Sequence, residues 1–171
     1  NDYVELPSSF ENLQDSFTIT AWINPSNLDS GSRIFADDEN NQGGYALSLS
    51  DQRNGNGHLR FYSRRVSPVS LDTSAGEIST DTWSFVTAVH DSVAKTRRIY
   101  INGVERASGT YTGNWGTDSG PATIGGETDD GEINNRFTGS IDEVHVFKGA
   151  LTATEINEVY AKTHACAEPV I

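Results

Sequence analysis

The chain has 171 residues, 35% of them hydrophobic, and its 24 acidic against 12 basic residues give a net charge of −12 at pH 7. This length suits a single domain with one core. So acidic a surface repels nucleic acid and anionic membranes, and no apolar run approaches the roughly 20 residues of a membrane span, so we expect neither partner.

The first half of the chain shows short strand patterns separated by turn residues. Phe17, Ile19, Ala21 and Ile23 alternate with more polar residues at a period of two, which is typical of a half-buried strand that ends at Pro25. Further strands are predicted at residues 2–6, 33–36, 45–49 and 58–62. The segments between the later ones, 37–44 and 51–57, are rich in Asp, Asn and Gly, as turns and loops are.

The second half continues the pattern, with strands predicted at residues 82–91, 98–105 and 121–125. Asn102-Gly103 is the strongest hairpin signal, because type I′ turns need positive φ at both central residues. The acidic segment 127–132 is expected to be a loop. In the run 137–147 the parity of apolar residues shifts near Asp142 and Glu143. That shift predicts either a central strand covered on both faces or a β-bulge.

One helix is predicted, after this last strand. Thr152 and Glu155 have the spacing of a capping box, and Leu151 and Ile156 that of a hydrophobic staple. We expect the helix to end near Lys162, a domain over residues 1–162, and residues 163–171 as a tail or the start of a linker to further domains of a parent chain. About a dozen strands and one terminal helix predict an all-β fold, an antiparallel two-sheet jelly-roll sandwich.

These segments carry a resemblance. The run Phe137-Thr-Gly-Ser-Ile-Asp-Glu-Val-His-Val-Phe147, followed by Ala150-Leu-Thr-Ala-Thr-Glu-Ile156, resembles the C-terminal signature of the laminin-G-like jelly-roll domains in the concanavalin A-like lectin and glucanase superfamily. Segments 2–6, 17–25, 82–91 and 98–105 match in the expected order. The helix and the Cys-Ala after it are also similar to such domains in a bacterial MSHA (mannose-sensitive haemagglutinin) pilus biogenesis protein.

The resemblance implies a function class. It indicates a non-catalytic adhesion or recognition module of a larger extracellular, cell-surface or periplasmic protein, with carbohydrate as the first ligand class and a cell-surface protein as the second. A spacer domain and a glucanase- or lyase-type enzyme are the alternatives. Because one fold serves many functions, the ligand depends on the site.

Asp142 is the candidate metal ligand. It lies in a strand that is otherwise apolar on both faces, and burying an unpaired carboxylate is costly. The resemblance implies a structural calcium held by Asp142 together with Asp2 or the carbonyl of Asn1. Calcium takes six to eight oxygens, so backbone carbonyls and waters would complete the shell. Alternatively, Asp142 pairs with an arginine such as Arg136, or caps a backbone amide.

Aromatic and acidic residues near loops are the candidate ligand-binding residues. Tyr62, Tyr111 and Trp115 could stack on sugar rings, whose C–H faces suit aromatic π-systems. Trp115 is favoured, because it lies in a polar, Gly-rich segment. Asp38 and Asp129, from the two acidic segments, could accept sugar hydroxyls or hold a second calcium. Packing in the core, or a solvated hairpin tip, is the alternative for each.

The sequence offers little support for catalysis. The related glucanases carry Glu-x-Asp-x-x-Glu on one strand. The same letters occur at Glu127-Thr-Asp-Asp-Gly-Glu132, but in Gly-flanked sequence that has the character of a loop and not of a strand. The four histidines lack metal-ligand spacing, and there is no Gly-x-Ser-x-Gly. Trp83, at the start of a strand, is expected in the core. The single cysteine, Cys166, has either a partner outside the domain or a free thiol.

Overall fold

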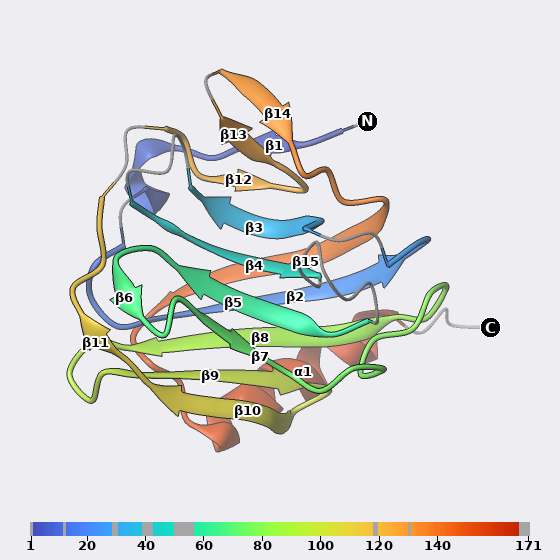
Figure 1. The fold of residues 1–171 in the computed structure, drawn as a ribbon. Coiled ribbons are helices and arrows are strands. Elements are labelled where there is room, and N and C mark those ends of the chain that lie inside the picture. The colour runs from blue at the N-terminus through green and yellow to red at the C-terminus, as the bar shows by residue number, and fades with distance from the viewer. Residues whose placement is uncertain are drawn as a thin grey trace.

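The computed structural model of the protein describes residues 2–11, 13–28, 31–38, 43–49, 57–117, 120–129 and 131–167. Strands dominate it, and one helix follows the last strand (Figure 1). The strands are β1 (Val4–Glu5), β2 (Phe17–Pro25), β3 (Arg33–Asp37), β4 (Tyr45–Leu49), β5 (Leu59–Ser63), β6 (Val66–Ser67), β7 (Ser70–Asp72), β8 (Ser84–Asp91), β9 (Thr96–Ile101), β10 (Val104–Thr110), β11 (Thr112–Gly113), β12 (Thr123–Ile124), β13 (Glu127–Asp129), β14 (Glu132–Asn134) and β15 (Gly139–Lys148). A 3₁₀ turn covers Ser8–Phe10, and α1 covers Ala153–Ala167.

Two antiparallel sheets pack face to face. One has the order β1-β12-β3-β4-β5-β7, and the other has the order β10-β9-β8-β2-β15. Apolar side chains of both sheets fill the space between them, among them Ile19 and Val86 from one sheet and Phe35, Leu47 and Phe61 from the other. This is the aligned packing of a β-sandwich, and it confirms the predicted fold class.

Strand β2 is buried on both faces. Ile19, Ala21 and Ile23 point into the core, as their period of two predicts. Thr18 points the other way and is equally buried. Its hydroxyl donates to the carbonyl of Gly149 at 2.9 Å and accepts from the amide of Leu151 at 2.9 Å. The outer face of β2 therefore anchors the link between β15 and α1.

Strand β15 lies at the edge of the five-stranded sheet, so the prediction of a central strand is wrong and the alternative of a bulge is confirmed. The pairing with β2 shifts register between Asp142 and His145. Glu143 has a φ of 48°, the left-handed conformation that an inserted residue often adopts. The bulge explains the parity change, because it returns Val144 and Val146 to the core side.

The start of α1 follows the prediction. The amide of Thr152 donates to Glu155 Oε2 at 2.8 Å, and the amide of Glu155 donates to Thr152 Oγ1 at 3.3 Å, which is the reciprocal capping box. The predicted end near Lys162 is wrong, because the helix continues to Ala167. Ala165 and Ala167 lie between Lys162 and Pro169, and alanine is the strongest helix former.

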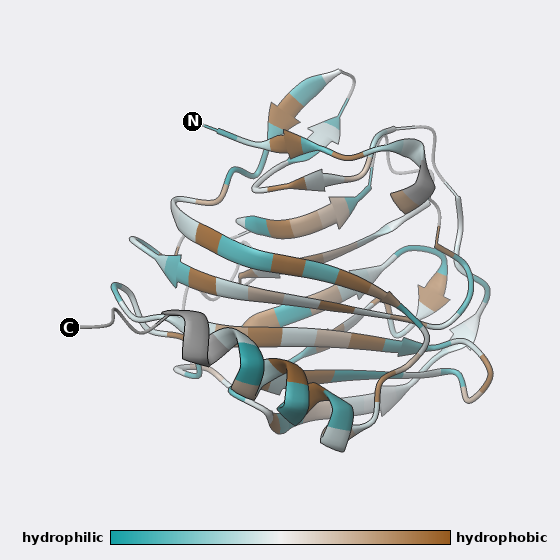
Figure 2. Ribbon diagram, turned by 180° about the vertical axis from the view of Figure 1, so that it is seen from behind, coloured by the Kyte–Doolittle hydropathy of each residue, from teal (hydrophilic) through white to brown (hydrophobic). Residues whose placement is uncertain are grey.

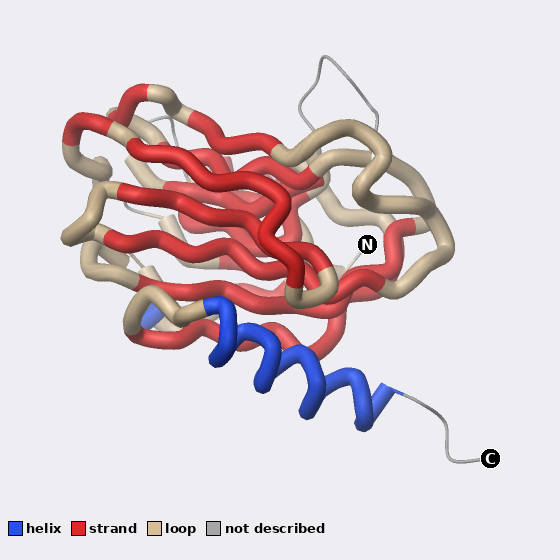
Figure 3. Tube along the Cα trace, turned by 90° about the horizontal axis from the view of Figure 1, so that it is seen from below, coloured by secondary structure: helices blue, strands red, loops and turns tan. Residues whose placement is uncertain are grey.

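Helix α1 lies along the outer side of the five-stranded sheet (Figures 2 and 3). Ile156 is fully buried there against Trp22, Phe85 and Tyr100. The indole of Trp22 also donates to Thr163 Oγ1 at 2.9 Å. One face of this sheet is therefore the core, and the helix covers part of the other.

Two hairpins show how the turns form. Asn102 and Gly103 have φ of 51° and 77°, which confirms the predicted hairpin between β9 and β10. The acidic segment predicted as a loop is instead the β13–β14 hairpin, in which Thr128 pairs with Ile133. Gly131 has a φ of 79°, a conformation that glycine adopts without strain.

The prediction that Trp83 lies in the core is wrong, because its side chain is 43% exposed. Trp83 precedes β8, whose pairing with β2 ends at Ser84. Within the described residues, β2 therefore does not pair with Trp83.

Candidate functional site

Trp115 and Tyr111 are core residues rather than surface platforms. Their exposed fractions are 7% and 4%. Trp115 stacks on His90 with ring centroids 3.9 Å apart, and the hydroxyl of Tyr111 lies 2.7 Å from His90 Nε2. The Gly-rich segment that contains Trp115 packs closely against the backbone before β4. A Cβ on Gly43 would lie 2.3 Å from the carbonyl oxygen of Thr117 in this segment. Neither ring offers a free face to a ligand.

Tyr62 lies on the outer face of the six-stranded sheet, at the middle of a row along β5. Arg60, Tyr62 and Arg64 are spaced two apart, so they share that face, while Leu59 and Phe61 point into the core. The Arg64 guanidinium lies 5.1 Å from the centre of the Tyr62 ring, within range of a cation–π interaction. Burial raises the pKa of Tyr62, which keeps its hydroxyl protonated at neutral pH.

The two arginines of this row are held by carboxylates from elsewhere in the sheet, Asp72 in the neighbouring strand β7 and Asp38 just after the end of β3. Arg60 Nε and Nη2 donate to the two carboxylate oxygens of Asp72 at 2.5 and 3.3 Å. The hydroxyl of Ser70 also donates to Asp72, at 3.0 Å. Arg64 makes the same two-point bond with Asp38, whose side chain is fully buried. Burial lowers the pKa of Arg64, but the Asp38 carboxylate outweighs it and raises the pKa overall.

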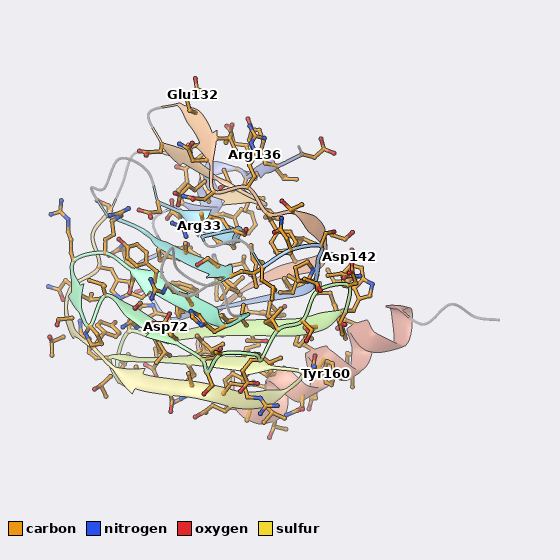
Figure 4. The ribbon with its side chains drawn as sticks, turned by 45° about the vertical axis from the view of Figure 1, so that its right-hand side comes forward. Arg33, Asp72, Glu132, Arg136, Asp142 and Tyr160 are labelled. Carbon is orange, nitrogen blue, oxygen red and sulfur yellow. The ribbon has the colours of Figure 1, made fainter. Side chains whose placement is uncertain are left out.

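A third pair lies across the same sheet. Arg33 Nε donates to Glu127 Oε2 at 2.5 Å, and the other oxygen of Glu127 accepts from the side-chain amide of Asn135. The β13–β14 hairpin thus brings Glu127 to β3. Asp129, the register partner of Glu132, is at the other end of the hairpin. Figure 4 places Glu132 at the tip of the molecule, away from Arg33 and Asp72.

Small residues separate these long side chains. In the sheet register, Ser48 lies between Arg33 and Arg60, and Ala46 lies next to Tyr62. Both small residues are fully buried, so the longer side chains form the accessible surface. We call this surface the polar face, and it comprises Arg33, Asp38, Arg60, Tyr62, Arg64, Asp72 and Glu127. It offers guanidinium donors, one aromatic ring and Asp72 as its most exposed carboxylate acceptor, and Glu127 reaches it from the β13–β14 hairpin.

Of the five predicted ligand-binding residues, the structure brings only Tyr62 and Asp38 to this face. Sequence reasoning missed the arginines. The signal was present, because residues 60, 62 and 64 share the polar parity of a strand whose other side is apolar. Their partners were not predictable, because Asp38 is separated from Arg64 by 26 positions.

The surroundings of Asp142 differ from those expected. Its side chain is exposed, and its Oδ1 accepts a hydrogen bond from the amide of Glu143 at 2.8 Å. The premise of a buried carboxylate is therefore wrong, and the alternative of a capped backbone amide is confirmed. Asp142 lies at the end of the molecule away from Asp72 (Figure 4).

The residues around Asp142 supply few calcium ligands. A surface depression of about 320 Å³ brings Asp2 beside Ser140 and Ile141, next to Asp142 in sequence. Asn1 lies outside the described residues. No group of three or more His, Cys, Asp or Glu side chains within the described ranges could hold a metal. These side chains alone do not fit a calcium cage, and the calcium site stays a prediction.

His90 is the most perturbed histidine in the described part of the chain. It is 1% exposed, and burial lowers its pKa to about 4. Its Nδ1 lies 3.2 Å from the carbonyl oxygen of Asp15, which favours protonation but does not offset the burial. Because the ring packs within the core, it serves the fold rather than a ligand.

None of the described helices is long and apolar enough to cross a membrane.

The architecture is that of a jelly-roll sandwich, and sequence comparison agrees. The Laminin_G_3 family model, described as the concanavalin A-like lectin/glucanases superfamily, matches residues 1–157. The chain therefore belongs to this superfamily. A search of curated protein sequences finds no relative.

Solved structures share the fold. The CBM40 module of the Ruminococcus gnavus IT-sialidase, bound to α2,3-sialyllactose, has a TM-score of 0.71 and 18% identity over 86% of this chain and 83% of its own. Domain 4 of the Geobacillus stearothermophilus extracellular arabinanase AbnA, in complex with arabinotriose, has a TM-score of 0.64 and 25% identity over 92% and 72%. A SAP-like pentraxin from Limulus polyphemus has a TM-score of 0.66 and 18% identity over 92% and 81%.

Proposed function

We propose that this domain is a non-catalytic carbohydrate-binding module and that its glycan binds on the polar face. One observation carries the proposal. Tyr62 lies between two arginines on the outer face of a sheet, and each arginine is fixed by a two-point bond to a carboxylate. An aromatic ring flanked by rigid donors and acceptors suits a sugar, which has an apolar C–H face and a rim of hydroxyls.

The ion pairs lower the entropic cost of binding. Long arginine side chains lose rotamer freedom when a ligand orders them, which weakens binding. Here Arg60, Arg64 and Arg33 are already held by Asp72, Asp38 and Glu127. The face is thus ordered before the ligand arrives. The superfamily membership and the neighbours solved with sialyllactose and arabinotriose support the same ligand class.

The same pairs argue against glycoside hydrolysis. Retaining enzymes need two carboxyl groups about 5 Å apart, one of them able to donate a proton. Each carboxylate of the polar face instead accepts hydrogen bonds from an arginine. A protein ligand or a spacer role is the alternative function.

The proposal includes the setting of the domain. We place it in a larger extracellular, surface or periplasmic protein, where repeated copies raise the strength of weak sugar contacts. A structural calcium at Asp142 also belongs to the proposal. The comparisons name no pilus protein, and an association with pili stays a prediction.

The test is a glycan array followed by titration of the bound glycan with Tyr62→Ala. We expect micromolar to millimolar affinity, because sugar hydroxyls exchange hydrogen bonds with water for similar ones with protein. Loss of the ring should weaken binding about tenfold, which corresponds to about 1.4 kcal/mol. Trp83→Ala is the control, because Trp83 is an exposed aromatic residue that lies outside the polar face, whereas Tyr62 is half-buried within it.

Two outcomes would contradict the proposal. An array without any bound glycan would favour a protein ligand or a spacer. Binding that is unaffected by Tyr62→Ala but weakened by Trp83→Ala would move the site to the start of β8.

A further inference from the structure

The polar face has no net formal charge. Its three guanidinium groups, on Arg33, Arg60 and Arg64, are each matched by one carboxylate at ion-pair distance. No arginine of the face is left without a counter-ion. This balance bears on the kind of glycan that can bind.

To be bound by an arginine, the carboxylate of an acidic sugar needs one edge of the guanidinium plane to be available. A carboxylate binds guanidinium best through two parallel N–H···O bonds on one edge of the plane. On Arg60 and Arg64 the edge formed by Nε and Nη2 is already taken by Asp72 and Asp38. A sugar carboxylate would have to displace one of these side chains or approach beside it as a like charge.

Displacement is unfavourable at Asp38 in particular. Its side chain is fully buried, so water cannot solvate the carboxylate when its bonds to Arg64 are broken. A buried charge that loses its partner carries a large desolvation cost. At longer range the net charge of −12 also repels anionic chains, although salt screens this effect.

Neutral sugars meet no such obstacle. A hydroxyl both donates and accepts, so adjacent hydroxyls can accept from a guanidinium N–H outside the two-point bond and donate to the neighbouring carboxylate. The pair Arg60–Asp72 presents this combination on one side of Tyr62, and Arg64, held from below by the buried Asp38, adds a guanidinium donor on the other side. Resting on the proposed function, we infer that the ligand is a neutral glycan and that sialylated or uronic-acid glycans are discriminated against.

The experiment compares matched glycans on the wild-type domain. Probes are lactose against 3′-sialyllactose, and arabinan oligosaccharides against oligogalacturonates, within an array that also carries other neutral and acidic glycans. We expect every bound glycan to be neutral, with its acid-capped form about tenfold weaker or worse. Affinity for the neutral glycan should change less than about twofold between about 0.05 and about 0.5 M salt, because no net charge is exchanged.

A variant tests the cause. Asp72→Asn keeps the shape of the side chain but removes the charge that occupies Arg60. The ratio of acidic to neutral binding should then rise about tenfold, which is the effect of one released arginine. Glu158→Gln makes the same charge change at an exposed position of α1, outside the polar face, and should leave the ratio unchanged. Melting temperatures confirm that both variants fold.

The outcomes separate the two claims. Preferred binding of acidic glycans by the wild-type domain overturns this inference and leaves the proposed function standing. The absence of any bound glycan overturns both. An unchanged ratio in Asp72→Asn, with the fold intact, shows that the charge balance does not set specificity.

Discussion

Asp142 and Asp38 show that an acidic residue is defined by its partner. Asp142, chosen because its strand is apolar, is exposed and caps the Glu143 amide at a bulge. Asp38, in a segment expected to be a solvated hairpin tip, is fully buried and fixes Arg64. In both cases the backbone geometry and a distant strand decide the environment, and neither is visible in the neighbouring sequence.

Calcium binding is testable at Asp142 even though few protein ligands surround it. A ligand that binds only the native state stabilises it by about 2.7 kcal/mol at about a hundredfold excess over Kd. If the site exists, millimolar calcium should raise the melting temperature of the wild type relative to chelator, and Asp142→Ala should remove the rise. Glu158→Ala, at an exposed acidic residue of α1 outside the surface depression that Asp2 lines, is the control. An equal melting temperature with calcium and with chelator in the wild type would sink the idea.

At the scale of elements, regular strands were predicted well because their signal is local. The alternation of Phe17, Ile19, Ala21 and Ile23 predicted β2 with its observed bounds, and the capping box predicted the start of α1.

Trp83 and Trp115 were assigned to the wrong environments, because the burial of a side chain is not a local property of the sequence. Whether a large aromatic is covered depends on which elements fold over it, and that information is spread across the chain. The polar face was missed likewise, because it needs the register of β3, β5 and β7.

Helix α1 should contribute strongly to stability through one buried side chain. Ile156 is fully buried between the helix and the sheet, where it meets Trp22 and Phe85. Ile156→Ala leaves a cavity there and should lower the free energy of unfolding by about 2–4 kcal/mol, measured by urea denaturation. Glu158→Ala, exposed on the same helix, should change it by less than about 0.5 kcal/mol.

A small loss in Ile156→Ala would mean that α1 is dispensable to the sandwich. The domain boundary predicted at residue 162 would then have to move to the end of β15. A large loss would instead tie the helix to the core, in keeping with the hydrogen bond from Trp22 to Thr163 just past that boundary.

The whole molecule combines a strongly acidic composition with a polar face that carries no net formal charge. Its 24 acidic residues outnumber the basic ones two to one, yet the polar face is balanced. The excess negative charge therefore lies elsewhere, where it favours solubility and repels polyanions. This division of charge is consistent with the proposed binding of uncharged glycans.

Global stability should fall in mild acid through His90. The unfolded histidine has a pKa near 6.5, whereas burial in the native core lowers the pKa to about 4, and the nearby Arg97 opposes protonation further. Between these two values the unfolded state binds more protons, so stability rises with pH; it is complete above 6.5 and is lost as pH falls toward 4. The difference corresponds to about 3 kcal/mol, an order-of-magnitude value.

The measurement is urea denaturation at pH 7, 5.5 and 4.5 for the wild type and for His90→Phe. The phenylalanine keeps the stack on Trp115 but cannot titrate, so the curve should flatten between pH 6.5 and 4.5 even if stability at pH 7 is lower. His145→Gln removes a histidine on the surface side of β15 and should keep the wild-type slope. Equal slopes in the wild type and His90→Phe would show that His90 does not control acid stability.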